Sequence, residues 1–486
     1  MNYRMILRII AMVLFIEAGL LVPGTLISLS LGEHAALIGF LKTLGIIAAA
    51  AIVLYLLTRH IKVTRFQARE GLVVTGLVWI FMSMLGALPF YFSGEIPSYI
   101  DAFFETVSGF TTTGSSILTE VESMSKGLLF WRSFTHWIGG MGVLVFLMAI
   151  VSLGGKNQGF TLHILRAESP GPAVGKMVPR MKKTAAILYW IYVGLTVLNV
   201  IFLLLGRMSL FDALCTAFGT AGTGGFGVYN DSCASFSPYV QIVTTVFMFL
   251  FSMNFSIYYL LLLGKVKEAL MDQELHLFWG IAITATVLLV WNVHSLYATM
   301  GEAIRHVCFT VATLMSTTGY GTTDFDLWPA FSKAIVLFLM IGGACAGSTG
   351  GGMKMVRFML LWKNLRRNIH KSLHPTEVKT VQVNGRPIDE GILDNTMAYL
   401  VAYVLIILFS ILVISLDGFS VETNISAVLA TFNNIGPGLA TVGPTCNFSM
   451  YSDLSKLVMI VDMLAGRLEI FPILILFSGS TWKKAR

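Results

Sequence analysis

The chain contains little charge: Asp, Glu, Lys and Arg together make up 12% of its 486 residues, whereas 56% are hydrophobic. Soluble domains usually carry about twice that share of charged residues. Several apolar runs also exceed the roughly 20 residues that a helix needs to cross a bilayer. The composition therefore excludes an ordinary soluble protein, and it predicts an all-α polytopic membrane protein.

Motifs for catalysis and metal binding are also missing from the sequence. The five cysteines form no CxxC pair, and there is no HExxH, no GxSxG and no intramembrane pair of aspartates placed to work together. A nucleotide-binding motif is absent as well. The longest polar segments, about 154–184 and 362–395, are too short for a separate globular domain. We therefore expect that the protein is not an enzyme.

Four short segments that contain glycine resemble one another. Each follows a helix-prone run and sets a glycine among small residues: TTTGSS (111–116), TAGTGG (220–225), TTGYGT (317–322) and NIGPGL (434–439). The shared glycines, Gly114, Gly222, Gly319 and Gly436, are 108, 97 and 117 residues apart. A period near 100 residues in a membrane-type chain predicts a fourfold internal repeat around one axis.

Hydrophobic runs around these segments predict ten membrane spans and four shorter half-helices. A half-helix that is too short to cross the membrane fits a re-entrant segment ending at its glycine turn. The expected unit is span, half-helix, turn and span, repeated four times around a central pore. Spans are expected at 6–30, 36–58, 71–92, 130–153, 185–206, 238–264, 276–299, 330–361, 396–416 and 452–481, and half-helices at 101–112, 210–220, 302–316 and 422–433. The units are 1–60 (two additional transmembrane helices), 61–165, 166–270, 271–370 and 371–486.

Basic residues indicate how the spans are oriented. With both termini on one side, 25 of the 33 Lys and Arg residues fall on segments of that same side. The positive-inside rule then places both termini in the cytoplasm and the four glycine turns toward the outside. This distribution accounts for the net charge of +7 without a nucleic-acid partner. Basic loops beside anionic membrane lipid are expected to bind it weakly.

The glycine turns have the chemistry of a filter for monovalent cations. Glycine reaches backbone angles that let consecutive carbonyls point to one side, and each half-helix directs its partly negative C-terminal end at the same place. Rings of carbonyls replace the hydration shell of potassium, and no ring of acidic side chains suited to divalent cations is present. The alternative is that glycine and threonine only permit close helix packing. The expected filter residues are Thr112, Thr113, Gly114, Thr220, Ala221, Gly222, Thr317, Thr318, Gly319, Asn434, Ile435 and Gly436.

The whole chain resembles the TrkH/TrkG/KtrB superfamily of potassium transporters. The resemblance lies in the four turns, the basic loops and the run IGGACAGSTGGGMK (341–354), and it is most specific in NNIGPGLATVG (433–443) and AGSTGGGMK (346–354). The two additional N-terminal spans fit the TrkH branch. The resemblance implies uptake of the potassium ion across a bacterial inner membrane through a four-repeat pore. Only the third turn comes near the TVGYG pattern of dedicated potassium channels, which implies weaker selectivity.

The glycine run at 341–354 interrupts the expected span 330–361. Each glycine costs about 1 kcal/mol relative to alanine in a helix, so a broken helix is expected below the third turn. By resemblance, this is the intramembrane loop that gates the pore. A simple packing kink and a phosphate-binding loop are the alternatives, and the inserted methionine and the membrane depth argue against the second. The expected gate residues in the loop are Gly347, Gly350, Gly351 and Gly352.

Arg467 is the second expected gate element, because a charge inside a membrane span is costly and by default functional. Counted from the fourth turn, it falls near the depth of the glycine loop. We predict that Arg467 lines the pore, donates hydrogen bonds to loop carbonyls and repels a resting potassium ion. A structural salt bridge with Glu469 or another buried acid is the alternative. Lys354 is expected to end the broken helix and to face the cytoplasm.

The cytoplasmic side carries two further features. The segment 362–375 is strongly basic, and Asn384-Gly385 is typical of a hairpin turn between two short strands. By resemblance, these surfaces dock a TrkA-like cytosolic regulatory subunit that binds NAD or ATP, and the chain pairs as a homodimer. The alternative is that the basic residues only set the topology. A proton- or sodium-coupled symporter with broken helices is the alternative function, although such symporters are built from inverted repeats.

Overall fold

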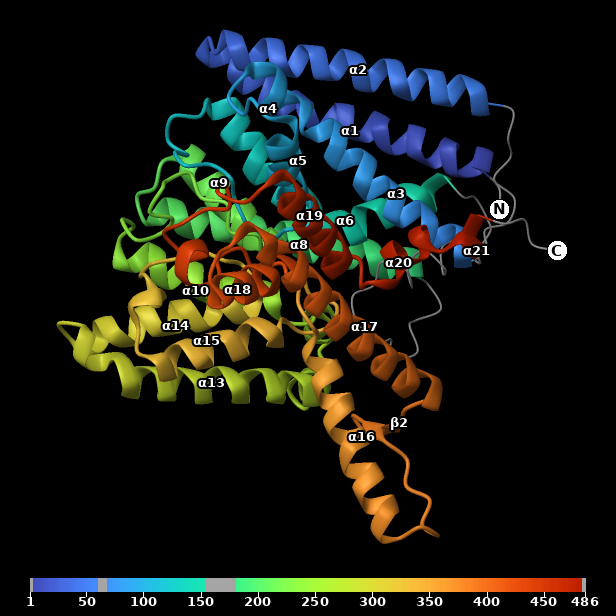
Figure 1. Ribbon diagram of the computed structural model, residues 1–486, viewed down its shortest axis with the longest axis vertical. Coiled ribbons are helices and arrows are strands. Elements are labelled where there is room, and N and C mark those ends of the chain that lie inside the picture. Colours follow the sequence, from blue (N-terminus) through green and yellow to red (C-terminus); the bar gives the residue numbers. More distant parts are fainter. Residues whose placement is uncertain (1–2, 60–67, 154–180, 483–486) are drawn as a thin grey trace.

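The computed structural model describes residues 3–59, 68–153 and 181–482. Figure 1 shows a bundle of helices from which α16 and a small hairpin project. Within the described ranges the strands are β1 (Gln382–Val383) and β2 (Arg386–Pro387), which pair antiparallel around the expected turn. Six described helices are long and apolar enough to cross a membrane, or up to seven if one bent pair counts as a span. The predicted all-α polytopic fold is therefore confirmed.

Two long helices precede the repeated units, as expected. They are α1 (Tyr3–Leu31) and α2 (His34–Thr58), which pack along each other at one side of the molecule (Figure 1). The hydroxyl of Tyr3 donates a hydrogen bond of 2.9 Å to the carbonyl of Trp482, and their rings stack. The beginning of α1 and the end of the last described helix therefore lie on the same side of the bundle.

Four units follow, and in each a longer helix precedes a half-helix and at least one further helix comes after it. The first contains α3 (Ala68–Gly86), α4 (Leu88–Ser93), α5 (Tyr99–Phe110) and α6 (Lys126–Leu153). The second contains α8 (Met181–Leu205), α9 (Leu210–Gly222), α10 (Pro238–Ser252), α11 (Phe255–Leu262) and α12 (Val266–Leu270). The third contains α13 (Gln273–Val293), η1 (His294–Leu296), α14 (Met300–Ser316), η2 (Phe325–Leu327), α15 (Ala330–Gly342) and α16 (Met355–Leu373). The fourth contains α17 (Glu390–Ile414), η3 (Ser415–Asp417), α18 (Val421–Phe432), η4 (Ala440–Val442), α19 (Asp453–Arg467), α20 (Phe471–Phe477) and α21 (Gly479–Trp482).

The expected boundaries between units agree only in part with the observed ends of the helices. Those at 60–61 and 165–166 lie outside the described residues, as does most of the basic segment 154–184. The boundary at 370–371 falls inside α16, because that helix extends to Leu373. The boundary at 270–271 lies between α12 and α13.

The half-helices α5, α9, α14 and α18 begin in the same way. Each has a serine or threonine N-cap whose hydroxyl accepts a backbone N–H three residues later, and an acidic residue in the first turn. A side-chain cap satisfies an amide that the helix leaves unpaired, and an acid in the first turn interacts favourably with the helix dipole. The sequence therefore specifies where each half-helix starts. The four caps are Ser98, Ser209, Thr299 and Ser420.

The second spans of units two, three and four are broken. The break at 343–354 between α15 and α16 was expected from its glycines. The other two expected spans, 238–264 and 452–481, were wrong as single helices. The first bends by 88° between α10 and α11, and the second is interrupted at Glu469 and Ile470, whose φ angles are 63° and 65°. Three interruptions therefore fall in the second halves of three units.

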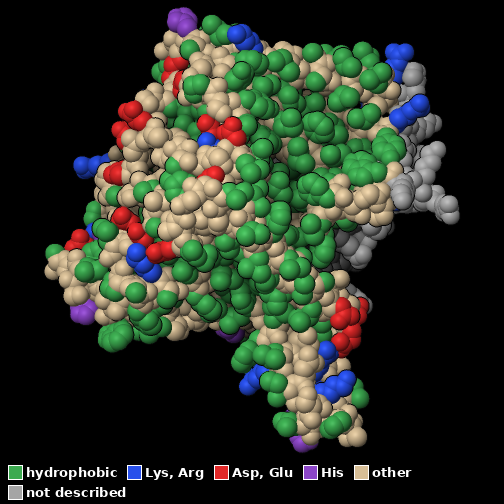
Figure 2. Space-filling model, in the orientation of Figure 1, with side chains coloured by type: hydrophobic (Ala, Val, Ile, Leu, Met, Phe, Trp, Pro, Cys, Tyr) green, Lys and Arg blue, Asp and Glu red, His purple; other side chains and the backbone are tan. Residues whose placement is uncertain are grey.

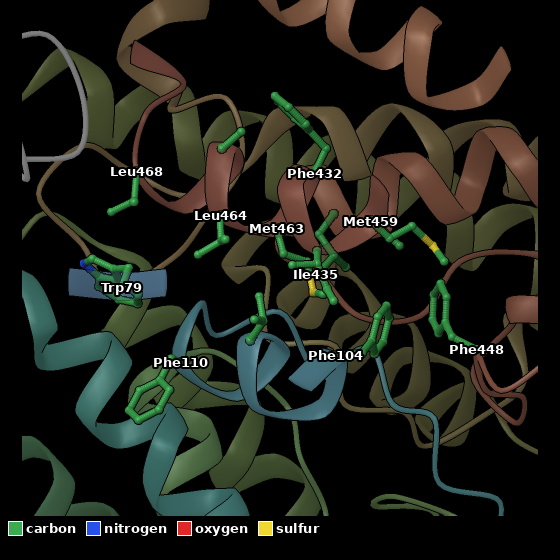
Figure 3. Packing of buried hydrophobic residues seen from close by; sticks show 14 of the residues in the cluster. Trp79, Phe104, Phe110, Phe432, Ile435, Phe448, Met459, Met463, Leu464 and Leu468 are labelled. Carbon is green, nitrogen blue, oxygen red and sulfur yellow. The ribbon is translucent and has the colours of Figure 1, made fainter. Parts of the chain in front are cut away.

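Large apolar side chains join the first and fourth units. Figure 3 shows Ile435, which follows α18, next to Met463 of α19. Phe104 of α5 and Phe448 face each other with ring centroids 5.9 Å apart. Figure 2 shows a broad band of hydrophobic side chains on the outside, with charged groups at its edges. That band is the surface expected of a protein whose flanks contact lipid.

Candidate functional site

The four half-helices end in four turns with one shared backbone conformation. The first turn residue adopts the left-handed conformation in each, at Thr112, Thr223, Thr317 and Asn434, with φ of 55°, 55°, 58° and 55°. The third is a glycine with positive φ, at Gly114, Gly225, Gly319 and Gly436. The second donates its N–H to the carbonyl five residues earlier over 2.8, 2.9, 2.9 and 2.8 Å, from Thr113, Gly224, Thr318 and Ile435. Each turn is thus the same helix-ending motif.

These turns form a closed ring. A methyl group placed on the Cα of Gly114 would lie 2.0 Å from the carbonyl oxygen of Gly224 in the next unit. The same relationship holds from Gly225 to Thr318 (2.0 Å), from Gly319 to Ile435 (2.0 Å) and from Gly436 back to Thr113 (2.9 Å). Each glycine therefore packs against the middle carbonyl of its neighbour, and only glycine fits. The fourth contact closes on the first unit, so the turns surround one axis.

The second turn lies three residues later than expected. Thr220, Ala221 and Gly222 form the last turn of α9, and the ring is made by Thr223, Gly224 and Gly225. The helix continues because Gly222 keeps a helical conformation, packed against the backbone of His136. A signal for the correct register was present, since Thr223 to Gly225 reads Thr-x-Gly like the first and third turns. The other nine expected filter residues lie in the ring.

The left-handed residues carry strain. Threonine is β-branched, and a non-glycine residue held in this region costs on the order of 1–3 kcal/mol, which the surrounding structure must offset. Part of that support comes from side chains that connect adjacent turns. The amide of Asn434 donates to the hydroxyl of Thr113 over 2.9 Å, and the hydroxyl of Ser115 donates to the carbonyl of Gly436 over 3.1 Å. Strain that is maintained in this way is typical of a functional site.

A buried ion pair supports the first two turns from behind. Glu105 of α5 accepts hydrogen bonds from the Ile117 N–H (3.0 Å), the Ser116 hydroxyl (2.9 Å) and the Arg132 guanidinium (2.6 Å). Arg132 also donates to the Gly227 carbonyl over 3.0 Å. The segments that leave the first and second turns are therefore held by one pair of charges. This pair was not predicted from the sequence, although charges inside apolar helices were a signal.

The interrupted span of the third unit lies directly under the ring. The Gly351 N–H donates to the Thr317 hydroxyl over 2.6 Å. Methyl groups placed on Gly350 and Gly351 would lie 2.8 and 2.7 Å from the carbonyl oxygens of Ser316 and Asn433, which precede the third and fourth turns. The loop from Gly343 to Lys354, which we call the glycine loop, therefore touches two turns of the ring.

Two cationic side chains hold the glycine loop. As expected, Arg467 donates to a loop carbonyl, that of Thr349 (2.6 Å), and it also donates to the Gly139 carbonyl of the first unit (2.8 Å). Glu469 pairs with Arg357, so the alternative of a salt bridge between Glu469 and Arg467 is not the one observed. The expectation for Lys354 was wrong: its side chain is buried, and its ammonium group donates to the Gly350 carbonyl. The Lys354 side chain points inward because its ammonium group donates a hydrogen bond to a carbonyl that the interrupted helix leaves without a helical partner.

The break between α10 and α11 in the second unit contacts the other side of the glycine loop. The Cys345 N–H donates to the Ser252 carbonyl at the end of α10 (3.0 Å), and the Phe255 N–H at the start of α11 donates to the Gly347 carbonyl (3.1 Å). Each break thus supplies the hydrogen-bond partners that the other lacks. The expected gate residues Gly347, Gly350, Gly351 and Gly352 all lie in this loop, at the level of Arg467. Among the described residues no group of three or more His, Cys, Asp or Glu is placed to hold a metal ion.

Comparison with known proteins gives one consistent result. A family model described as TrkH, cation transport protein, matches residues 39–484. Two proteins named Trk system potassium uptake protein TrkH, from Salmonella typhimurium and Vibrio parahaemolyticus, are 34% and 33% identical over 100% and 99% of this chain and 100% of their own lengths. The crystal structure of the potassium transporter TrkH from Vibrio parahaemolyticus matches with a TM-score of 0.87 and 31% identity, covering 99% of this chain and 100% of that one.

Proposed function

Because the chain belongs to the TrkH family of cation transport proteins, we propose that it takes up potassium ions across a membrane through the ring of four turns. Family membership also confirms the expectation that the protein is not an enzyme. The observation that carries the proposal is the closed ring, in which each glycine packs against the middle carbonyl of the next turn. The helices of this fold place four identical backbone motifs around one axis, where an ion can meet carbonyl oxygens from all four.

We assign the ion-binding carbonyls to the three residues of each turn. Carbonyl oxygens from four turns can replace the hydration shell of potassium, and the half-helix C-termini add negative potential at the same place. The assignment keeps nine of the expected residues and moves the second turn to Thr223, Gly224 and Gly225. Potassium is the transported ion in this proposal. The filter residues are Thr112, Thr113, Gly114, Thr223, Gly224, Gly225, Thr317, Thr318, Gly319, Asn434, Ile435 and Gly436.

The glycine loop and Arg467 form the gate in this proposal. The loop lies against two turns of the ring, and Arg467 connects it to the first unit on another side. The buried ammonium of Lys354 adds a second positive charge to the loop. Fixed positive charges in a poorly solvated passage repel a cation strongly. The arrangement therefore represents a closed state, in which the loop must shift before ions pass.

The sidedness follows from the basic residues. We assign the protein to the bacterial inner membrane, with both termini, α16 and the hairpin in the cytoplasm. The projecting surface of α16 and the hairpin is where a TrkA-like regulatory subunit that binds NAD or ATP would dock. Pairing as a homodimer and weak contacts of the basic segments with anionic lipid complete the proposed assembly.

Rubidium uptake into proteoliposomes tests the proposal. We expect external potassium to suppress rubidium uptake more strongly than the same concentration of sodium does. Uptake by protein without partner is expected to be low, and Arg467→Ala is expected to raise it. Equal competition by sodium and potassium, or no uptake by either protein, would contradict the filter assignment.

The same vesicles distinguish the alternative, a proton- or sodium-coupled symporter. We expect rubidium to distribute according to its own electrochemical gradient, because no organic-sized site or inverted repeat is needed to account for the fold. Accumulation beyond that gradient when a proton or sodium gradient is imposed would favour the symporter instead.

A further inference from the structure

One carboxylate fastens both ends of the glycine loop. Glu274 lies in the first turn of α13, and its Oε1 accepts the N–H of Ala346 over 2.7 Å and the N–H of Val356 over 3.0 Å. Ala346 lies near the start of the loop, and Val356 lies in the first turn of α16, directly after its end. The side chain of Glu274 is buried. A single oxygen atom therefore sets the distance between the two ends of the segment that lies beneath the ring.

The end of α13 that carries Glu274 is in turn held by the tip of the hairpin. The side-chain oxygen of Asn384 accepts the Gln273 N–H over 3.0 Å, and its amide nitrogen donates to the Asp272 carboxylate over 2.7 Å. Asp272 is the N-cap of α13 and also accepts the Leu275 N–H over 3.0 Å. The tip of the hairpin thus contacts the two residues that immediately precede Glu274.

The hairpin also rests on the helix that follows the loop. Val381, Val383 and Ile388 are buried against Val356 and its neighbours at the start of α16. A pair of two-residue strands is not stable by itself, so these contacts fix its position. The hairpin therefore lies between the start of α13 and the start of α16, which are the two elements that Glu274 connects.

We propose that Glu274 is a positioning residue that holds the gate closed and that the Asn384 tip of the hairpin controls it. This inference rests on the proposed gate and adds how that gate is regulated. Displacement of the hairpin frees Asp272 and Gln273, and the start of α13 then shifts. As a result, Glu274 no longer accepts hydrogen bonds from the Ala346 and Val356 N–H groups at the same time. The glycine loop then leaves the ring, and ions pass. A cytosolic protein that engages the exposed hairpin would open the pore by this route.

Rubidium uptake by the full-length protein without partner, in proteoliposomes, tests the role of Glu274. Glu274→Ala removes both hydrogen bonds to the loop ends, and we expect uptake to rise at least tenfold, because only the closed state loses them. Glu274→Gln keeps an acceptor oxygen and is expected to raise uptake less. The ratio of potassium to sodium competition stays the same in both variants, because the filter is untouched. A changed competition ratio, or equal uptake by the Ala and Gln variants, would overturn the role of Glu274.

Variants of the hairpin tip test the control step. Asn384→Asp places a second carboxylate against Asp272, so we expect it to break the contact and raise uptake several-fold. Asn384→Gly keeps the left-handed turn, where φ is 50°, and removes the contact without repulsion, so a smaller rise is expected. Asn368→Asp, the same change on an exposed position of α16, is the matched control. If Asn384→Asp behaves like Asn368→Asp, the proposed control by the hairpin is wrong.

Combined variants separate this inference from the proposed gate. The pair Glu274→Ala with Asn384→Asp is expected to match Glu274→Ala alone, because both act through one contact, whereas independent additive rises would overturn the inference. If Arg467→Ala raises uptake while the Asn384 variants do not, the gate stands and the control step is wrong. If none of these variants raises uptake although all are folded by size-exclusion chromatography, both proposals fail.

Discussion

Arg132 is buried against Glu105, with its Nε 2.6 Å from the carboxylate oxygen Oε1. Only 3% of the Arg132 side chain is exposed and none of the Glu105 side chain, so the two charges depend on each other. The guanidinium also lies 3.6 Å from the centre of the Phe226 ring, directly after the second turn. One ion pair therefore positions the segments that leave two adjacent turns of the ring.

We expect Glu105→Gln to reduce ion selectivity more than flux. Breaking a buried ion pair on one side costs about 3–5 kcal/mol, and the strain falls on segments next to the first and second turns. Rubidium uptake should persist in an open variant such as Arg467→Ala, while sodium becomes a better competitor. The matched control is Glu268→Gln, which neutralises the exposed pair between Lys265 and Glu268 and should change neither quantity, because exposed pairs contribute little.

The size of Arg467 and its hydrogen bonds to the Thr349 and Gly139 carbonyls predict a graded effect on the proposed gate. Arg467→Ala removes both donors and the charge, and we expect at least a tenfold rise in rubidium uptake by protein alone. Arg467→Lys keeps the charge but replaces the planar guanidinium, which donates to two carbonyls at once, with a single ammonium group. Rubidium uptake by this variant should therefore lie between that of the wild type and that of the alanine variant. Flux assays at one potassium gradient measure this order. Identical uptake by all three proteins would show that Arg467 does not close the pore.

The corrected register of the second turn predicts different outcomes for two nearby glycines. Gly225→Ala would place a methyl group 2.0 Å from the Thr318 carbonyl oxygen at a φ of 78°, so we expect loss of selective uptake in an open variant. At Gly227 the nearest atom to such a methyl group is 3.5 Å away, so Gly227→Ala should transport normally. Competition assays on the two variants test the register. Normal selectivity with alanine at 225 would be incompatible with a ring at Thr223 to Gly225.

A stability effect is expected at the break between α19 and α20. Arg357 pairs with Glu469, and its guanidinium lies 3.7 Å from the centre of the Tyr399 ring. Glu469→Leu leaves the arginine charge buried and should destabilise the protein by about 3–5 kcal/mol, whereas the double variant Arg357→Leu with Glu469→Leu should recover much of that loss. Thermal unfolding in detergent compares the wild type, the single variants Glu469→Leu and Arg357→Leu, and the double variant. A double variant that is less stable than both single variants would show that the two charges do not depend on each other.

The sequence alone determined most of the helices and their order. The third half-helix was expected at 302–316 and lies at Met300–Ser316, because a threonine cap, an acidic first turn and a glycine turn specify its ends locally. The contact of Arg467 with the glycine loop could be predicted from the sequence as well, since a charge inside an apolar span is costly and needs a partner. The interruption at 343–354 was equally visible, because its glycines disfavour a helix by themselves.

Only the tertiary structure decided which glycines meet, which spans break and which charges pair. Gly222 and Gly225 have the same local preferences, and contact with the Thr318 carbonyl selects Gly225 for the ring. The break at Met253 has no glycine or proline beside it, whereas the break at Ile470 comes directly before the helix start that contains Pro472, a residue that disfavours a continuous helix. The first of them exists because Ser252 and Phe255 exchange hydrogen bonds with the glycine loop instead of continuing a helix. Glu105 and Arg132, or Glu274 and the loop amides, are far apart along the chain. Such contacts depend on how helices pack in three dimensions, and no local pattern of residues encodes that packing.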